Sequence, residues 1–260
     1  MRRKVLTLGL LVAAGACASA ALGAPNTPQT PSPTTYTSLE DAYLVHNPLY
    51  SAGQVPAVQC NLPDVPLTTR SDVQRSGDAM IVCLERAWKP VVERADLHFL
   101  PTDLYVVTVG AGTACGDFDD DSDAFYCADD SGIYVDWAQH VEESPDDRQY
   151  ASAYLLYVLA HEFGHHLQQL VGIMGYSDDS LERGRRLELQ ASCLAAAFLG
   201  ANQATLNLYG DRFDAYHDGA GTGDHDHGSG KNNKAWSKAA FAAKSPSACN
   251  TWAAPAKRVS

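Results

Sequence analysis

One long helical pattern constrains the fold of this chain more than any other feature. The segment from Gln149 to Gly172 is apolar nearly all round, and its residues 161–165 read His-Glu-Phe-Gly-His, a match to H-E-x-x-H. At about 100° per residue, His161 and His165 lie about 40° apart on one helix face, one turn apart. Two imidazoles so placed can share one tetrahedral zinc ion. We therefore expect a central helix whose histidines line a cleft.

The rest of this helix favours a metal site over a chance match to the pattern. Glu162 lies on the same side as His165, where it reaches a water on the metal without displacing it, as a general base does. The acidic segment 144–147 predicts the helix start, with Ser144 as its cap, and Gly172 predicts its end. Apolar residues recur on the opposite face, which we expect to pack in the core: Leu156, Leu159, Phe163, Leu167 and Leu170.

The first 20 residues have the pattern of a secretory signal peptide. Basic residues at positions 2–4 precede a short apolar run, and Ala18-Ser19-Ala20 matches a cleavage site. The apolar run is too short to span a membrane, and no other segment is a candidate span. We expect a secreted protein. Lipid anchoring through Cys17 is the alternative, although residues 14–16 fit it poorly because a larger aliphatic residue is usual at the first of them.

The net charge argues against two classes of partner. It is −12 at pH 7, and it becomes −15 when the three positive charges of the signal peptide are removed. Nucleic acids and anionic membranes repel a chain this acidic. We therefore expect no nucleic acid partner and no attachment to an anionic membrane.

The cysteines indicate disulfide bonds. An even number remains in the exported chain, which argues for three bridges. Many pairings are open, and nearness in the sequence favours Cys60 with Cys83 and Cys115 with Cys127, which leaves Cys193 with Cys249. Cysteine ligation of a metal is the alternative, but the chain has no C-x-x-C pair.

Composition divides the chain into ranges. Residues 21–38 form a Pro- and Thr-rich linker, residues 39–254 are expected to form the domain, and residues 255–260 a short tail. Within the domain, apolar residues at helical spacing predict a helix over Val73–Ala95, which Pro90 kinks or ends early.

Three short segments have the composition of β-strands. They are Leu97–Leu100, Leu104–Gly110 and Gly132–Trp137. In the third, strict alternation places Ile133 and Val135 on one face and Tyr134 on the other. Because this strand lies shortly before the histidine helix, we expect it to form the upper edge of the cleft.

Two loops carry groups that can bind metals. Acidic residues alternate between Cys115 and Cys127, but this loop lacks the glycine and the final carboxylate of an EF-hand, so we interpret it as a solvated acidic loop rather than a calcium site. The loop Gly219–Gly230 contains His225 and His227. We interpret it as a flexible loop rather than a second metal site.

A second helix, Ser180–Ala201, supplies a third ligand. A catalytic zinc usually has three protein ligands and one open position. Glu188 follows a turn after the first helix, and the small residues Ala191 and Ala195 beside it allow two antiparallel helices to approach closely. Glu182 is the competing carboxylate, and a surface position for Glu188 is the alternative.

Six short segments together resemble one bacterial family, known as putative neutral zinc metallopeptidases. The segments are HEFGHHLQ from His161, ELQASC from Glu188, FYCAD from Phe125, IYVD from Ile133, HGS from His227 and CNTW from Cys249. The resemblance covers residues 39–252. It implies an α+β, zincin-like fold, a central histidine helix with a second ligand helix and a small sheet, and His161, His165 and Glu188 as zinc ligands with Glu162 as base.

The resemblance also implies roles for two further residues. Ser192 stands where the family has an aspartate that could orient a ligand histidine. We therefore expect reduced zinc affinity or activity unless Tyr154 or water takes over that role. The family match favours His227 as a cleft residue that polarises a substrate carbonyl or stabilises an oxyanion. Ala128 replaces a family proline, which we expect to be harmless.

Three functions remain open at this level. We expect a secreted zinc metallopeptidase that acts on peptides or proteins. The first alternative is a non-catalytic, zinc-stabilised binding module of the cell envelope, and the intact Glu162 argues against it because binding needs no general base. The second is a zinc amidase acting on cell-wall peptides, which no residue separates from a peptidase.

Overall fold

The computed structural model describes residues 38–119, 122–142, 148–176, 180–220 and 223–260 of the 260-residue chain. The expected signal peptide, which includes Cys17, lies outside these residues. Residues 21–37 of the expected linker also lie outside them. So does the helix start expected at residues 144–147.

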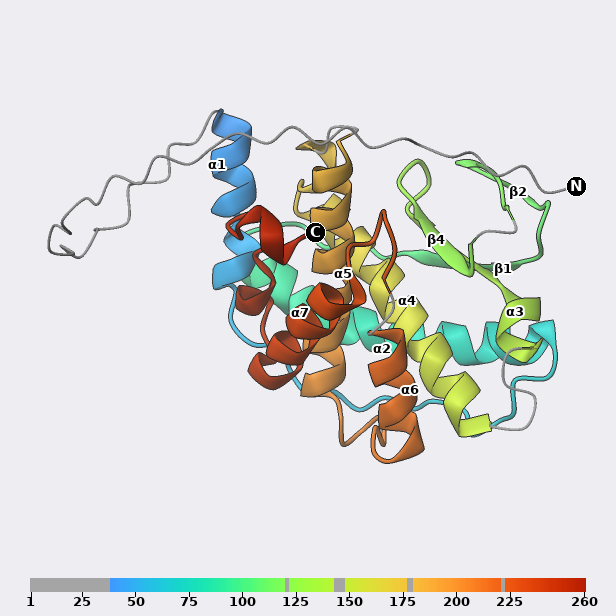
Figure 1. Cartoon of the computed structure of the whole chain (residues 1–260). Helices are drawn as coiled ribbons and strands as arrows, with labels where there is room; N and C mark the ends of the chain where they lie inside the picture. Colours follow the sequence, from blue (N-terminus) through green and yellow to red (C-terminus); the bar gives the residue numbers. More distant parts are fainter. Residues whose placement is uncertain (1–37, 120–121, 143–147, 177–179, 221–222) are drawn as a thin grey trace, which may run out of the picture. The chain divides into compact units, whose positions relative to one another are not determined.

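Helices make up most of the structure, beside one small sheet (Figure 1). The α-helices are α1 (Leu39–Val45), α2 (Arg70–Arg94), α3 (Trp137–Glu142), α4 (Arg148–Leu170), α5 (Leu181–Ala201), α6 (Asp211–Gly219) and α7 (Gly230–Ala243). Short 3-10 turns are η1 (Pro48–Ser51), η2 (Met174–Tyr176), η3 (Pro246–Cys249) and η4 (Ala256–Arg258). The strands are β1 (Asp103–Val107), β2 (Gly112–Thr113), β3 (Gly116–Asp117), β4 (Ala124–Cys127) and β5 (Gly132–Asp136).

The sheet has the order β1-β5-β4, with β1 parallel and β4 antiparallel to the central β5, while β2 and β3 form a separate hairpin. Helices α4 and α5 run side by side, α7 packs along α5, and β4 packs against α4 (Figure 1). Mixed helices and a small sheet agree with the expected α+β class.

Both expected site helices are present. The first ends after Leu170, and Gly172, at φ +72, makes the left-handed turn expected of a stop residue. The amide of Ile173 then donates to the carbonyl of Gln168 at 2.8 Å. The second helix starts after Ser180, whose side chain accepts from the Arg183 amide.

A glycine lets these two helices touch. A Cβ built on Gly164 would lie 2.8 Å from both the Cα and the carbonyl oxygen of Ala191, which is closer than real Cβ contacts. The backbones of α4 and α5 therefore meet directly at this point. Since Glu188 lies one turn before Ala191, the close approach brings its side chain towards the histidines.

The core lies on the far side of α4 from the cleft. Leu156, Leu159, Phe163 and Leu167 are fully buried as expected, while Leu170 is only half-buried. They pack towards α2, which contributes the buried Trp88.

The helix expected over Val73–Ala95 is present as α2, with its end near the expected residue and an earlier start. The helix does not end at Pro90 but continues to Arg94, and it begins at Arg70, after the cap Thr69, rather than at Val73. Val91 and Val92 are fully buried beyond the proline, so their packing compensates for the one backbone hydrogen bond that proline cannot make.

Two of the expected strands differ in the structure. Leu97–Leu100 is not a strand, because it docks on α4, where the carbonyl of Leu100 faces His166 Nε2 at 2.9 Å. The next strand ends at Val107 and not at Gly110, which adopts φ +82 in a turn.

The strand expected at the edge of the cleft is central instead. All five residues of β5, including Tyr134, are buried, because the strand is paired on both edges and covered on both faces. Trp137 begins α3 rather than ending the strand. The strand that borders the cleft is β4, which occupies an edge of the sheet.

The three expected disulfides are present: Cys60–Cys83, Cys115–Cys127 and Cys193–Cys249. The last joins α5 to the C-terminal segment. The stretch between Cys115 and Cys127 is more than a solvated loop, because it contains β3, β4 and the fully buried Phe118. Its residues 120–121 lie outside the described part.

The C-terminal residues pack on the helices, since Val259 is fully buried and its carbonyl accepts from Arg185 Nε at 3.0 Å. Within the described ranges, no helix is both long enough and apolar enough to cross a membrane.

Candidate metal centre

Three side chains from α4 and α5 converge on one point. Glu188 Oε2 lies 3.2 Å from His161 Nε2 and 3.3 Å from His165 Nε2, and the two Nε2 atoms lie 3.2 Å apart. The helical spacing of the histidines and the close packing of the helices produce this arrangement. The competing carboxylate, Glu182, instead pairs with Arg186 at 2.7 Å.

This donor set fits a zinc ion. Zinc–nitrogen and zinc–oxygen bonds of about 2.0–2.1 Å place the ligands of a tetrahedral site about 3.3 Å apart. The three distances between donor atoms match that spacing. Two imidazoles and one carboxylate are also a ligand set that leaves one position open for water or substrate.

A chain of buried amides orients His165. Its Nδ1 lies 2.9 Å from Gln168 Oε1. The Gln168 amide nitrogen donates to the carbonyl of Leu187 and to Gln190 Oε1, at 2.8 and 3.1 Å, which turns its oxygen towards the histidine. Nδ1 of His165 therefore carries the hydrogen, and Nε2 offers its lone pair to the site.

The amide chain continues into the core and was not foreseen from the sequence. Gln190 Nε2 donates to the carbonyl of Cys249 at 3.0 Å and to Tyr50 Oη at 2.8 Å. Both glutamines are fully buried. The available signal was the position of Gln168, three residues after His165 and thus beside it on the helix.

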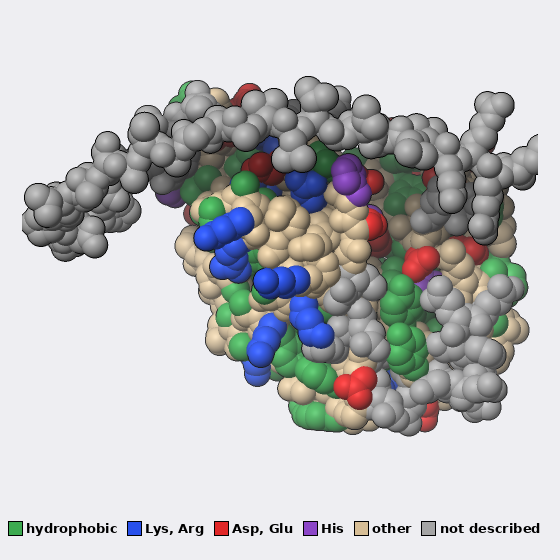
Figure 2. All heavy atoms as spheres, viewed as in Figure 1, with side chains coloured by type: hydrophobic (Ala, Val, Ile, Leu, Met, Phe, Trp, Pro, Cys, Tyr) green, Lys and Arg blue, Asp and Glu red, His purple; other side chains and the backbone are tan. Residues whose placement is uncertain are grey.

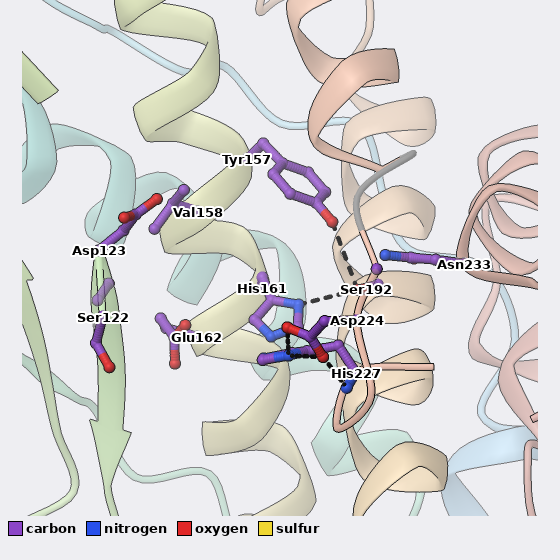
Figure 3. Close-up of a pocket in the computed structure, with 12 residues that line it drawn as sticks. Ser122, Asp123, Tyr157, Val158, His161, Glu162, Ser192, Asp224, His227 and Asn233 are labelled. Carbon is purple, nitrogen blue, oxygen red and sulfur yellow. Dashed lines mark hydrogen bonds and ion pairs between the residues drawn. The ribbon is translucent and has the colours of Figure 1, made fainter. Parts of the chain in front are cut away.

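A hydroxyl orients the other histidine. Ser192 Oγ lies 3.0 Å from His161 Nδ1 and 3.5 Å from Tyr157 Oη, and Ser192 is buried (Figure 3). Ser192, which stands where the family pattern has an aspartate, therefore itself contacts the imidazole of His161. The Tyr154 hydroxyl donates to Asp123 at 2.9 Å instead.

Glu162 faces the opposite direction from Ser192. Its side chain extends from α4 towards Ser122, and only 7% of the residue is exposed (Figure 3). Cavities of about 340 and 300 Å³ lie beside the three converging side chains. The residues that line both are Ser122, Ala124, His161, Glu162 and His227. Glu162 is therefore within the cleft and next to the candidate ligands.

His227 enters the cleft from a hairpin. Asp224 Oδ1 accepts from the amides of Asp226 and His227, at 2.8 and 2.7 Å, and Asp224 also lies 2.9 Å from His227 Nδ1 (Figure 3). His227 Nε2 points inward and lies 3.5 Å from Glu188 Oε2. His225, by contrast, pairs with Asp226 at the surface.

Charge interactions within the cluster shift two pKa values. Burial acts to raise the pKa of Glu188, but the charge of His165 and hydrogen bonds from both histidines hold it well below its usual value. Burial acts to lower the pKa of His165, but the charge of Glu188 and hydrogen bonds raise it to about 9. Without metal, the carboxylate therefore holds a protonated imidazole, and metal binding must release that proton.

Comparison with known proteins identifies relatives of the chain. Residues 67–252 match the family described as "putative neutral zinc metallopeptidase". An uncharacterized protein of Mycobacterium tuberculosis is 27% identical over 142 residues, which cover 50% of this chain and 46% of that protein. The uncharacterized protein YpfJ of Escherichia coli is 26% identical over 201 residues, covering 66% of this chain and 69% of YpfJ. The chain thus spans about half the length of the mycobacterial relative, and no solved structure matches it.

Proposed function

The chain belongs to the putative neutral zinc metallopeptidase family, and on that premise we propose that it is an exported zinc-dependent peptidase. We assign the metal to His161, His165 and Glu188, and the role of general base to Glu162. The observation that carries the proposal is the spacing of 3.2 to 3.3 Å between the three donor atoms, with a buried carboxylate beside them in a cleft.

Bound zinc would supply a Lewis acid for a peptide carbonyl and would make a water easier to deprotonate. The protein's own residues perform the proton transfers. Glu162 takes a proton from the attacking water and then passes it to the leaving amine. Gln168 and Ser192 keep the two imidazoles in the orientation that directs Nε2 to the site.

We assign His227 to the substrate oxygen. Asp224 accepts from the Nδ1–H of His227, and although burial acts to lower the pKa of His227, the charges of Glu188 and Asp224 raise it. The protonated imidazole can therefore also donate a hydrogen bond from Nε2 into the cleft. A donor at that position stabilises the negative charge that develops on a carbonyl oxygen during attack. The short hairpin holds the imidazole in place through the two amide hydrogen bonds to Asp224.

The proposal includes location and domain organisation. Three disulfides support an oxidising, extracellular compartment. We propose that residues 1–20 direct export, that residues 21–38 link them to the peptidase domain of residues 39–254, and that residues 255–260 follow it. The substrates proposed are peptides or proteins.

The test separates a peptidase from a zinc-stabilised binding module. Glu162→Gln keeps the shape of the side chain but removes the base. We expect one zinc per chain in wild type and variant by mass spectrometry, and turnover of a peptide library lower by a factor of about 10²–10⁴ in the variant. His161→Ala should lose both zinc and turnover.

Two outcomes would contradict the proposal. Equal cleavage by wild type and Glu162→Gln would remove the base from the mechanism. Zinc binding without cleavage of any library peptide would favour the binding module, unless cross-linked cell-wall peptides are cleaved, which would identify an amidase.

A further inference from the structure

The C-terminal part of this acidic chain has the opposite charge. The chain contains 31 Asp and Glu against 19 Lys and Arg, yet residues 227–260 include no Asp or Glu. The basic residues of this part are Lys231, Lys234, Lys238, Lys244, Lys257 and Arg258, and all six are exposed. Charge is therefore segregated along the sequence, which the net charge of −12 conceals.

Three of these residues form a stripe along α7, which we call the lysine stripe: Lys231, Lys234 and Lys238. At about 100° per residue they lie within about 60° of one another, about one per turn, and extend over about 10 Å. The buried residues of α7, Asn233, Trp236, Ser237 and Ala240, lie on the opposite face. Figure 2 shows basic side chains gathered over α7 and the C-terminal segment.

No carboxylate of the described residues neutralises the lysine stripe. None lies within ion-pair distance of its three amino groups, whereas arginines elsewhere pair with acids, as Arg75 does with Asp72 and Arg183 with Asp41. Arg258, from the C-terminal segment, lies over the ring of Trp236 at 4.4 Å. The positive charge of this surface therefore remains available to a partner.

We propose that the lysine stripe binds a flexible, linear polyanion, namely a chain of polyol units joined by phosphodiesters. Amino groups spaced about one helical turn apart match a repeating anion, and a flexible chain can follow a narrow stripe while avoiding the acidic remainder of the protein. This surface is independent of the metal centre and of the proposed peptidase activity.

Other anionic partners fit the surface less well. Single-stranded nucleic acids need aromatic rings on which bases stack. Of the aromatic residues of α7, Trp236 is 6% exposed, and the half-buried Phe241 packs against Phe213 and Tyr216. A membrane surface helix inserts large apolar side chains, and the exposed large hydrophobic residues of the described ranges all lie before residue 210.

The stripe lies close to the cleft. Asn233, on the buried face of the first turns of α7, lines the larger cavity, and His227 lies just before the helix. A polymer bound along the outer face of α7 would hold the cleft near whatever is attached to that polymer.

Binding of fluorescein-labelled poly(glycerol phosphate), followed by anisotropy in a salt series, tests the proposal. The test variant is Lys231→Gln with Lys234→Gln and Lys238→Gln. The control variant has the same change in net charge on exposed residues of α2: Arg75→Gln, Arg86→Gln and Lys89→Gln. Zinc content should match wild type in both variants, and thermal unfolding should match it in the stripe variant. The control variant loses the hydrogen bond from Arg86 to the Gln59 carbonyl and the ion pairs of Arg75 and Lys89, so its folded fraction is measured beside its binding.

We expect the stripe variant to bind at least about tenfold more weakly and the control to bind like wild type. The slope of log affinity against log salt should fall in magnitude by about 2, because each contact of a flexible polyanion contributes about 0.7. Equal binding by both variants, or no binding by wild type, would overturn the proposal. So would tighter binding to single-stranded DNA or anionic vesicles, or a dimer in light scattering that only the stripe variant loses.

Discussion

The two walls of the cleft are built in different ways. On one side, α4 and α5 hold His161, His165 and Glu188 in a densely packed region, and His165 is only 8% exposed. On the other side, the hairpin of residues 223–229 presents His227 and Asp224, whose side chains are 51% and 61% exposed. The edge strand β4 and the two residues before it add Ser122–Tyr126 at a third border, where residues are half-buried.

Because the two walls are built differently, we expect them to affect different properties of the protein. Ligand atoms held by a packed core need little reorganisation to bind a metal, because Gln168 and Ser192 already orient both imidazoles. The hairpin depends on local hydrogen bonds to Asp224 and contributes little to the core. We therefore expect changes in the helix pair to affect stability and zinc together, and changes in the hairpin to affect turnover alone.

The largest effect should come from Gly164→Ala, which forces α4 and α5 apart. The added Cβ meets the backbone of Ala191, which cannot move without displacing α5 and Glu188. We expect the free energy of unfolding to fall by about 3 kcal/mol in urea titrations, with weaker zinc binding.

The control is Gly184→Ala, at a glycine of α5 with no heavy atom within 4 Å of the added Cβ. This change should stabilise the protein by up to about 1 kcal/mol, because alanine is the better helix former. Equal effects of the two substitutions would show that close helix packing does not support the site.

The next effect concerns His140 of α3, a buried titratable group. Burial lowers the pKa of His140 from 6.5 to about 4, against the opposing charges of Asp123 and Asp136. Its ring packs against Tyr154, which holds Asp123. Between about pH 6.5 and 4 the unfolded chain binds more protons than the folded one, so stability falls as pH falls, by about 3 kcal/mol over the whole window.

His140→Gln stays neutral and should remove this dependence from unfolding curves measured between pH 4 and 7. Burial also lowers the pKa of His166, and its contribution remains in both proteins, so their difference isolates His140. Parallel stability curves for wild type and variant would contradict the prediction.

A smaller effect is expected from Gln168→Leu. Loss of the amide leaves His165 Nδ1 without its acceptor, so zinc affinity should fall by about 10- to 100-fold in chelator competition. Gln169→Leu alters the exposed neighbouring glutamine and should leave zinc affinity unchanged. Unchanged affinity in the first variant would mean that packing alone orients the imidazole.

The smallest effect should come from the exposed hairpin of residues 223–229. Asp224→Asn weakens the hold on His227, and turnover should fall about tenfold while zinc content and stability stay unchanged, since one hydrogen bond to a charged group contributes about 1.5–3 kcal/mol at most. Asp226→Asn, on the same hairpin, should be neutral. A loss of zinc in Asp224→Asn would instead make His227 a metal ligand.

Several features could be predicted from the sequence because they depend on residues near one another along the chain. Helical periodicity placed His161 and His165 on one face, and nearness favoured the first two disulfides, which left the third. The family resemblance and the small residues beside Glu188 pointed to the third converging side chain, and the structure brings all three together.

Tertiary contacts decided the rest. The two-sided burial of β5 and the edge position of β4 follow from strand order, which alternation within one segment does not encode. The orientation of Gln168 depends on Leu187 and Gln190 of another helix, and the inward position of His227 depends on how its hairpin packs. The sequence by itself determined which side chains could hold a metal, since helix geometry is local. Only the packing of distant segments decided which neighbours orient those side chains and which residues face them across the cleft.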